Sequence, residues 1–173
     1  MTAFHPKPQE IKSVVLRSGD FHFGCGPTRI STLLGSCVSI TLWHPRRRIG
    51  GMCHYMLTDR RRPPGTPPDG RYANEAFELF LQHVAREATT PTEYQAKLFG
   101  GARMFDNAED RRTDIGAQNI EYGRKLLSEH SITLISSHVG GSGRRKLYFD
   151  LWSGEVWLAF PEGEGARTSR AEP

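Results

Sequence analysis

The chain has 173 residues, of which 37% are hydrophobic and 24% are charged. This length suffices for one domain with a buried core, and no stretch is apolar for long enough to predict a membrane-spanning helix. The first residues lack the pattern of a secretory signal peptide, so we expect a soluble, cytoplasmic protein without membrane insertion. Three cysteines without regular spacing are then expected to be free thiols.

The formal net charge is +4 and the sequence pI is about 9.1. Short basic runs account for much of this charge, at residues 46–48, 60–62, 111–112 and 144–146. Such runs are typical of solvated loops, and they also suit contact with an acidic surface on a partner. No signature of nucleic-acid binding accompanies them, so nucleic acid is not an expected partner.

The first half of the chain predicts short strands. Residues 1–10 form a polar arm that we expect to be flexible. Residues 38–42 alternate between apolar and polar side chains, a turn with Pro45 follows, and residues 49–57 return as the second strand of a hairpin. Before this hairpin, β-branched or alternating patterns predict strands at residues 11–17 and 21–23.

The second half predicts helices separated by strands. Residues 59–70, rich in proline, form an exposed loop long enough to be mobile. Apolar residues recur on one face of a helix at 72–88, and a second helix at 115–130 has Asp114 available as its N-cap. We expect the inward side chains of the two helices to be Ala73, Ala76, Phe77, Phe80, Val84, Ile120 and Leu127. The remaining strands are predicted at residues 95–99, 132–136, 146–151 and 155–160, the last two forming a hairpin.

This order of elements predicts an α+β fold rather than a regular βαβ alternation. We expect a single domain over residues 11–160, with a mixed β-sheet and two main helices packed on one side of it. Residues 161–173 are polar and charged, and we expect a disordered tail there.

Cys37 is the candidate nucleophile. It follows Gly35 and Ser36, which leave room for a substrate to approach the backbone, and backbone N–H groups at such a bend can bind a developing oxyanion. A buried structural cysteine would give the same local pattern.

His54 is the candidate base. If residues 38–43 and 49–56 pair, His54 comes beside Cys37, where the ring can take the thiol proton and lower the pKa of the thiol. Ser31 and Thr32 offer a hydroxyl that can orient the imidazole, although each residue also suits an ordinary strand.

A metal site is not expected. The cysteines and His54 could supply soft ligands, but their gaps are irregular, and the adjacent Cys53 and His54 would point to opposite faces of a strand. Residues 140–143 are glycine-rich, but they lack the lysine and the following helix of a phosphate-binding loop. No cofactor is expected either.

Four blocks together resemble the chemoreceptor glutamine deamidase (CheD) family, over residues 11 to 160. The blocks are residues 32–38 with 50–57, then 96–105, 114–119 and 140–146. In that family the catalytic set is a cysteine, a histidine and a threonine. The resemblance implies that Cys37 and His54 are the first two, and it leaves the third open. The threonine often lies six residues before the cysteine, where this chain has Ser31; Thr32 matches if the intervening loop is one residue shorter.

The resemblance implies hydrolysis of glutamine side chains to glutamate on the cytoplasmic helices of methyl-accepting chemotaxis receptors. Cys37 would form a thioester, N–H groups around Gly35 and Ser36 would hold the oxyanion, and His54 would shuttle protons. Two glycine pairs, Gly100 with Gly101 and Gly140 with Gly141, would shape the rim of the cleft. His138 departs from the family, whose members usually have an acidic residue there.

Two other functions fit the same residues. Relatives of this family also bind a phosphatase of the chemotaxis response regulator, so the chain could act as a regulatory partner of that enzyme or of the receptors. The second alternative is a receptor methylesterase that uses the same cysteine.

Overall fold

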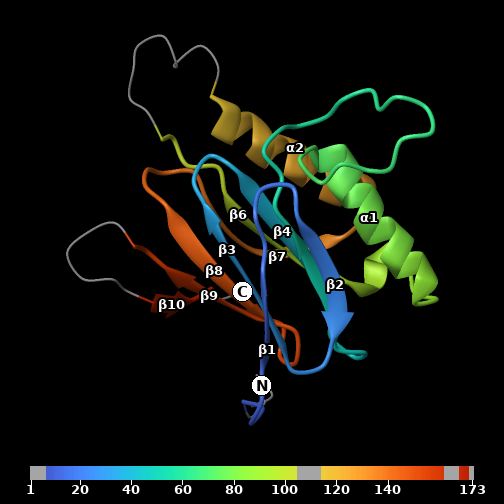
Figure 1. Cartoon of the computed structure of the whole chain (residues 1–173), viewed down its shortest axis with the longest axis vertical. Coiled ribbons are helices and arrows are strands. Elements are labelled where there is room, and N and C mark those ends of the chain that lie inside the picture. The colour runs from blue at the N-terminus through green and yellow to red at the C-terminus, as the bar shows by residue number, and fades with distance from the viewer. Residues whose placement is uncertain (1–6, 105–113, 162–167, 172–173) are drawn as a thin grey trace.

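Ten strands form two five-stranded mixed sheets in the computed structural model, which describes residues 7–104, 114–161 and 168–171 (Figure 1). The first sheet has the order β1 (Lys12–Val15), β3 (Thr28–Leu34), β8 (Arg145–Asp150), β9 (Glu155–Ala159) and β10 (Thr168–Arg170). The second has the order β2 (Phe21–Cys25), β5 (Ile49–Cys53), β4 (Val38–His44), β6 (Gln95–Gly100) and β7 (Thr133–Val139).

The predicted α+β class is confirmed, but the structure has two sheets where one was expected. The chain leaves the first sheet at the end of β3, bends through Gly35 and Ser36, and enters the second sheet at β4. Strand β3 pairs with β8, whose residues lie more than a hundred positions further along the chain. Local alternation predicts most of the strands, though not β3 or β10, and it cannot reveal such distant pairing, which explains why the second sheet was missed.

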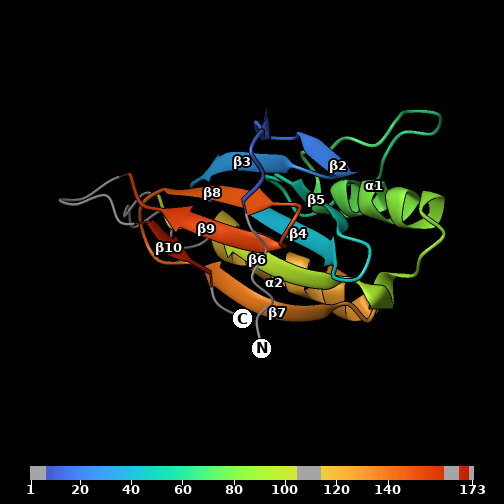
Figure 2. The same cartoon turned by 90° about the horizontal axis from the view of Figure 1, so that it is seen from below.

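Both helices cover the same face of the second sheet, as predicted. They are α1 (Ala73–Arg86) and α2 (Ile115–Glu129), and a short 3-10 helix, η1 (Pro91–Glu93), precedes β6. Figure 2 shows the resulting layers, with the first sheet on the side of the second sheet away from the helices. The side chains expected to face inward from the two helices are buried, and Asp114 caps α2 by accepting a hydrogen bond from the Ala117 N–H.

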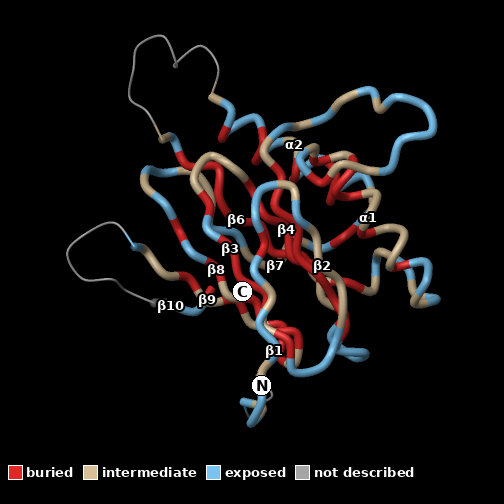
Figure 3. The backbone as a smooth tube through the Cα atoms, viewed as in Figure 1, coloured by how far each residue is buried: buried red, intermediate tan, exposed pale blue. Residues whose placement is uncertain are grey.

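The second sheet therefore has a core on each of its faces, and its central strands are buried almost throughout (Figure 3). Successive side chains of a strand point to opposite faces. Accordingly, Met52 packs into the core between the two sheets, while Cys53 packs into the core beneath the helices. The same alternation directs His54 toward the first sheet and Tyr55 toward α2.

Tyr55 fixes α2 on the sheet. Its hydroxyl donates to the backbone carbonyl of Asn119 at 2.7 Å, and the side chain is fully buried. Gly123 lies one turn further along the helix, where an added Cβ would be only 2.4 Å from the Tyr55 hydroxyl oxygen. A glycine inside a helix usually weakens it, so its presence here is explained by this close approach.

We expect Gly123→Ala to lower the free energy of unfolding by about 1–3 kcal/mol, because overpacking outweighs the better helix propensity of alanine. Urea denaturation followed by circular dichroism measures the change. Ser128→Ala, at an exposed position of the same helix, is the matched control and should stay within about 0.5 kcal/mol of the wild type. A more stable Gly123→Ala protein would show that the helix moves easily to accommodate the methyl group.

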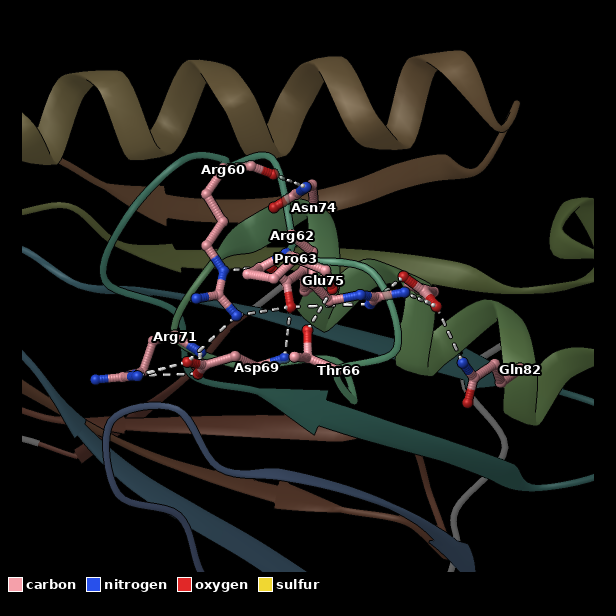
Figure 4. Close-up of polar contacts among 10 residues, drawn as sticks. Arg60, Arg62, Pro63, Thr66, Asp69, Arg71, Asn74, Glu75 and Gln82 are labelled. Carbon is pink, nitrogen blue, oxygen red and sulfur yellow. Dashed lines mark hydrogen bonds and ion pairs between the residues drawn. The ribbon is translucent and has the colours of Figure 1, made fainter.

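The proline-rich loop over residues 59–70 was expected to be exposed and long enough to be mobile, but its arginines tie it to α1 (Figure 4). Glu75, only 1% exposed, accepts hydrogen bonds from Arg60 Nε at 2.6 Å and from the Asp69 N–H at 2.7 Å. Arg62 pairs with Glu78 one turn later, at 2.7 Å. Much of the basic run at 60–62 is thus neutralised within the protein.

We expect Glu75→Gln to lower the free energy of unfolding by about 1–3 kcal/mol at neutral pH, since charged hydrogen bonds to a buried group are lost. The Arg60 hydrogen bond holds the pKa of Glu75 below its ordinary value of 4.5. The contribution is therefore complete above that value and is lost as the pH falls through the lower, folded-state pKa.

Urea denaturation at neutral and acidic pH tests this expectation. The difference between wild type and variant should shrink on acidification, and Glu78→Gln, at a more exposed ion pair on the same helix, should change stability less. An equal effect of the two substitutions at neutral pH would contradict a special role for Glu75.

Residues 168–170, within the segment where a disordered tail was expected, form the short strand β10. There β10 pairs antiparallel with β9, with Ser169 opposite Leu158. The arm at residues 1–6 and the tail residues 162–167 and 172–173 lie outside the described residues. Within the described ranges, neither helix has the length and apolar character that crossing a bilayer requires.

Candidate active site

Backbone pairing brings the Cys37 and His54 segments together. Val38, the first residue of β4, and Tyr55, just after β5, exchange two N–H···O bonds of 2.9 Å. Both side chains pack into the core beneath the helices, so the neighbouring Cys37 and His54 face the first sheet. The predicted hairpin is confirmed, and its pairing supplies this juxtaposition.

The His54 ring is buried, with the residue 4% exposed, and is held by hydroxyl groups on both sides. Thr32 Oγ1 lies 2.7 Å from Nδ1, and Ser18 Oγ lies 3.3 Å from Nε2. Since the Thr32 hydroxyl donates its one hydrogen to the Leu16 carbonyl at 2.9 Å, it accepts from His54, which places the ring proton on Nδ1. The lone pair on Nε2 is therefore available as a base.

Thr32, and not Ser31, touches the histidine. On β3 the side chains of Ile30, Thr32 and Leu34 share the face that points into the molecule. Ser31 alternates to the other face, together with Leu33, which is 42% exposed. Of the two hydroxyls that the sequence left open, the structure thus brings only Thr32 to the imidazole.

Cys37 is partly exposed, whereas Cys53 is buried. Burial raises the pKa of the Cys37 thiol, and a hydrogen bond from the Ser18 side chain partly opposes this effect. Burial also lowers the pKa of His54 to about 4, against a smaller opposing effect of Asp20.

At rest the pair is therefore a neutral thiol and a neutral imidazole. Among the described residues the hydrogen bonds of the His54 ring go to Thr32 and Ser18, and none joins the ring directly to Cys37. The groups that lower the pKa of Cys37 in this structure are the Ser18 side chain and the Cys37 backbone, so a lowering by His54 stays a prediction.

The segment around Gly35 and Ser36 has the features of an oxyanion site. Its carbonyls are taken: the Gly35 carbonyl accepts from the Ala102 N–H at 2.9 Å, and the Cys37 carbonyl from the Gly101 N–H at 2.8 Å. In the described part of the chain, the N–H groups of residues 35–37 donate to no other backbone carbonyl. They remain available to a substrate oxygen.

Asn119, a fully buried residue of α2, holds the two segments that carry Cys37 and His54. Its side-chain Nδ2 donates to the Met56 carbonyl at 2.8 Å and lies 3.5 Å from the Ser36 carbonyl. Helix α2 thereby fixes the spacing between the loop that bears the nucleophile and the strand that bears the base.

The predicted glycine pairs, at residues 100–101 and 140–141, include glycines with two different roles. Gly101, Gly140 and Gly141 line a cavity of about 720 Å³. The other lining residues are Arg103, Met104, Asp114, Ala117, Ile120, Ser142 and Gly143. Gly100 is not among them: an added Cβ there would lie 2.2 Å from the Cys37 carbonyl oxygen, so this glycine allows β6 to approach the nucleophile loop.

Arg145 binds the glycine-rich turn at residues 140–143 and is itself only 2% exposed. Its guanidinium donates to the ring Nδ1 of His138 at 2.8 Å, to the His138 carbonyl at 2.6 Å, and to the Gly140 carbonyl. Burial, and then the nearby arginine, lower the pKa of His138, so a neutral imidazole accepts this bond. The histidine at this position therefore contacts the arginine that binds the glycine turn.

The other cysteines, which were weighed as soft metal ligands, lie in different surroundings. Cys25 is exposed, and Cys53 is buried beneath the helices, where burial raises the pKa of its thiol to about 12. The described residues contain no group of three or more histidine, cysteine or acidic side chains placed to hold a metal ion. The basic run at 46–48 lies in the turn at the opposite end of β4 from Cys37, which at about 3.3 Å per strand residue is roughly 20 Å away.

Sequence reasoning missed Ser18 and the positioning role of Asn119. Ser18 stands in a short polar turn before β2, and its residue type alone is typical of any turn. Only the pairing of this turn with the backbone of His54 reveals its position.

A thiol beside unpaired N–H groups, with an oriented imidazole nearby, is the arrangement that cysteine hydrolases use for acyl transfer. Comparisons with known proteins agree with this class of enzyme and identify one family within it. Residues 56–160 match the family model described as CheD chemotactic sensory transduction.

Relatives named as members of the same family cover nearly the whole chain. The probable chemoreceptor glutamine deamidase CheD 3 of Dechloromonas aromatica (strain RCB) is 63% identical over 164 residues, covering 95% of this chain and 96% of its own. The probable chemoreceptor glutamine deamidase CheD of Pseudomonas savastanoi pv. phaseolicola (strain 1448A / Race 6) is 44% identical over 153 residues, 87% of this chain and 86% of its own. This chain belongs to the CheD family.

We expect the His54 ring to stay neutral, with its proton on Nδ1, from neutral pH down to about pH 5. Its pKa of about 4 in the folded state lies below the ordinary value of 6.5, so this group makes the fold less stable as the pH falls between those values. Proton–nitrogen NMR correlation of labelled histidine reports both tautomer and titration. Thr32→Val should weaken the tautomer preference, and a ring already protonated near pH 6 would contradict the expectation.

Proposed function

We propose that this protein hydrolyses the side-chain amide of particular glutamines on chemoreceptors and leaves glutamate. The proposal is supported by the relatives' names and, above all, by the hydrogen bond between Thr32 and His54, which leaves the Nε2 lone pair as the base of the ring. The substrate would be a methyl-accepting chemotaxis receptor, approached at its cytoplasmic helices.

The first half of the reaction forms a thioester. The Cys37 thiol loses its proton toward His54, and the thiolate attacks the carboxamide carbon of the glutamine. The oxyanion of the tetrahedral intermediate lies against N–H groups of the segment at 35–37. The protonated His54 then gives its proton to the departing nitrogen, ammonia leaves, and the acyl group remains on sulfur.

The second half of the reaction hydrolyses the thioester and regenerates the free enzyme. Water gives a proton to His54 Nε2 as its oxygen attacks the thioester carbon, and the same N–H groups bind the second oxyanion. The carbon–sulfur bond breaks, glutamate is released, and the proton returns to the sulfur of Cys37. The catalytic groups in both halves are side chains and backbone of this chain, and water is the second reactant.

The burial of Cys37 and His54 is compatible with this reaction, which begins and ends with both groups neutral. A neutral imidazole with a pKa of about 4 is ready to accept a proton at neutral pH. Ionising the pair costs free energy in this poorly solvated site, so the charges are best stabilised when the substrate and the N–H groups surround them.

We expect Cys37→Ala to abolish glutamine-to-glutamate conversion on a receptor cytoplasmic fragment, as measured by mass spectrometry of its peptides. Cys25→Ser removes an exposed thiol away from the site and is the matched control, which should retain full activity. Conversion that survives in Cys37→Ala would refute the proposal.

The same pair of variants separates the alternative functions. A regulatory partner of a chemotaxis phosphatase would keep its effect without the thiol. A methylesterase would cleave receptor methyl esters and leave glutamine amides intact. Offering both substrates to the wild-type protein distinguishes the two hydrolytic activities.

A further inference from the structure

Part of the wall of the cavity of about 720 Å³ is bonded directly to the loop that carries the nucleophile. The Gly101 N–H donates to the Cys37 carbonyl at 2.8 Å, and the Ala102 N–H donates to the Gly35 carbonyl at 2.9 Å. An added Cβ at Gly35 would lie 2.9 Å from the sulfur of Met104, another lining residue. The cavity therefore adjoins the nucleophile loop, at the edge of the sheets where β3 and β6 end and α2 begins (Figure 1).

Arg103 continues the same stretch of chain along the cavity. Its N–H donates to the Gly141 carbonyl at 2.9 Å, so the glycine turn holds its backbone. Two residues of extended chain span at most about 7 Å, which limits the distance between the Cα atoms of Gly101 and Arg103. One turn of an α-helix rises about 5.4 Å. A helix that presents one side chain to Cys37 can therefore bring a side chain three or four positions away to the level of Arg103.

The Arg103 side chain keeps hydrogen-bond donors for a ligand. It is 58% exposed, and one terminal nitrogen donates to the Asp114 carboxylate at 3.1 Å. A guanidinium has five N–H donors, and among the described residues no other side chain bonds to this one. Asp114 also accepts from the Ala117 N–H at 2.9 Å as the N-cap of α2. Asp114 therefore positions Arg103 at the cavity without using all of its donors.

The charges around the cavity favour an anionic ligand. Arg103 and Asp114 are the charged lining residues, and their charges balance. Arg145 adds a positive charge behind the wall, since its guanidinium donates to the carbonyl of Gly140, a lining residue. It is 2% exposed, its Nε has no hydrogen-bond partner, and within the described ranges it pairs with no carboxylate. A buried charge without a counter-ion is costly, so an anion in the cavity would be stabilised by it.

We propose that this cavity is a specificity site in which Arg103 binds a carboxylate of the receptor helix, three or four positions from the glutamine that reacts. Arg103 would donate to Asp114 and to the receptor carboxylate at the same time. The preferred substrates are then glutamines with an aspartate or glutamate one helical turn away. This inference rests on the proposed function, because it takes a receptor helix to lie at Cys37. Arg103 acts in binding and has no part in proton transfer.

The test uses a receptor cytoplasmic fragment with an acidic residue one turn from a target glutamine, and the same fragment with alanine in place of that acidic residue. We expect wild-type kcat/KM to be about tenfold lower on the alanine fragment, mainly through KM, because a charged hydrogen bond is lost. Arg103→Gln should lose about as much on the acidic fragment and should no longer distinguish the two fragments, since both changes remove the same contact. Mass spectrometry measures conversion at that glutamine.

Arg46→Gln is the matched control. It removes the same charge from an arginine whose side chain is 84% exposed, in the turn at the opposite end of β4 from Cys37. Its kcat/KM should stay within about twofold of the wild type on both fragments. Urea denaturation verifies that both variants fold. A merely structural role of Arg103 would lower activity on both fragments and keep the wild-type preference, which would contradict the proposal.

Binding measured without turnover separates this inference from the proposed function. In the Cys37→Ala protein, fluorescence anisotropy of the labelled fragments should show about tenfold tighter binding of the acidic fragment, and adding Arg103→Gln should abolish the difference. Equal binding of both fragments, or a preference that survives Arg103→Gln, overturns the specificity site. The binding contrast together with a wild-type protein that converts no glutamine refutes the proposed function and leaves the specificity site standing.

Discussion

The hydrogen bond between Thr32 and His54 is the contact on which the site depends, and it joins the two sheets. Thr32 belongs to β3 of the first sheet, while His54 follows β5 of the second. The bond forms only if the layers pack face to face with the correct register, because a shift of one residue would turn Thr32 outward. The core between the sheets therefore determines the tautomer of the base as well as the stability of the fold.

A second constraint is the low solvation of the reacting groups. Burial raises the pKa of Cys37 and lowers that of His54, so the resting site carries no ion pair. This avoids the desolvation cost of a permanent thiolate and imidazolium. The hydroxyls of Ser18 and Thr32 provide oriented dipoles in place of fixed charges, and the N–H groups of residues 35–37 lie where negative charge develops.

The surroundings of the site explain several features that look like isolated motifs in the chain. Gly100 allows β6 to approach the Cys37 carbonyl, and Asn119 joins the loop of the nucleophile to the strand of the base. Arg145 holds the glycine turn that lines the neighbouring cavity. Three arginines of the basic runs make contacts within the protein, as Arg60 and Arg62 bind α1 and Arg145 lies buried. The run at 111–112 lies outside the described residues.

The sequence by itself determined the local elements and the two central residues. Periodicity of two or 3.6 residues depends only on neighbours, so the helices, most strands and the hairpin at 38–57 could be predicted, and the spacing of Cys37 and His54 on that hairpin followed. The choice of Thr32 over Ser31, the contribution of Ser18 and the division into two sheets were decided only by tertiary structure. Each depends on pairing between segments distant in the chain, such as β3 with β8, and one strand's pattern contains no information about which partner it meets.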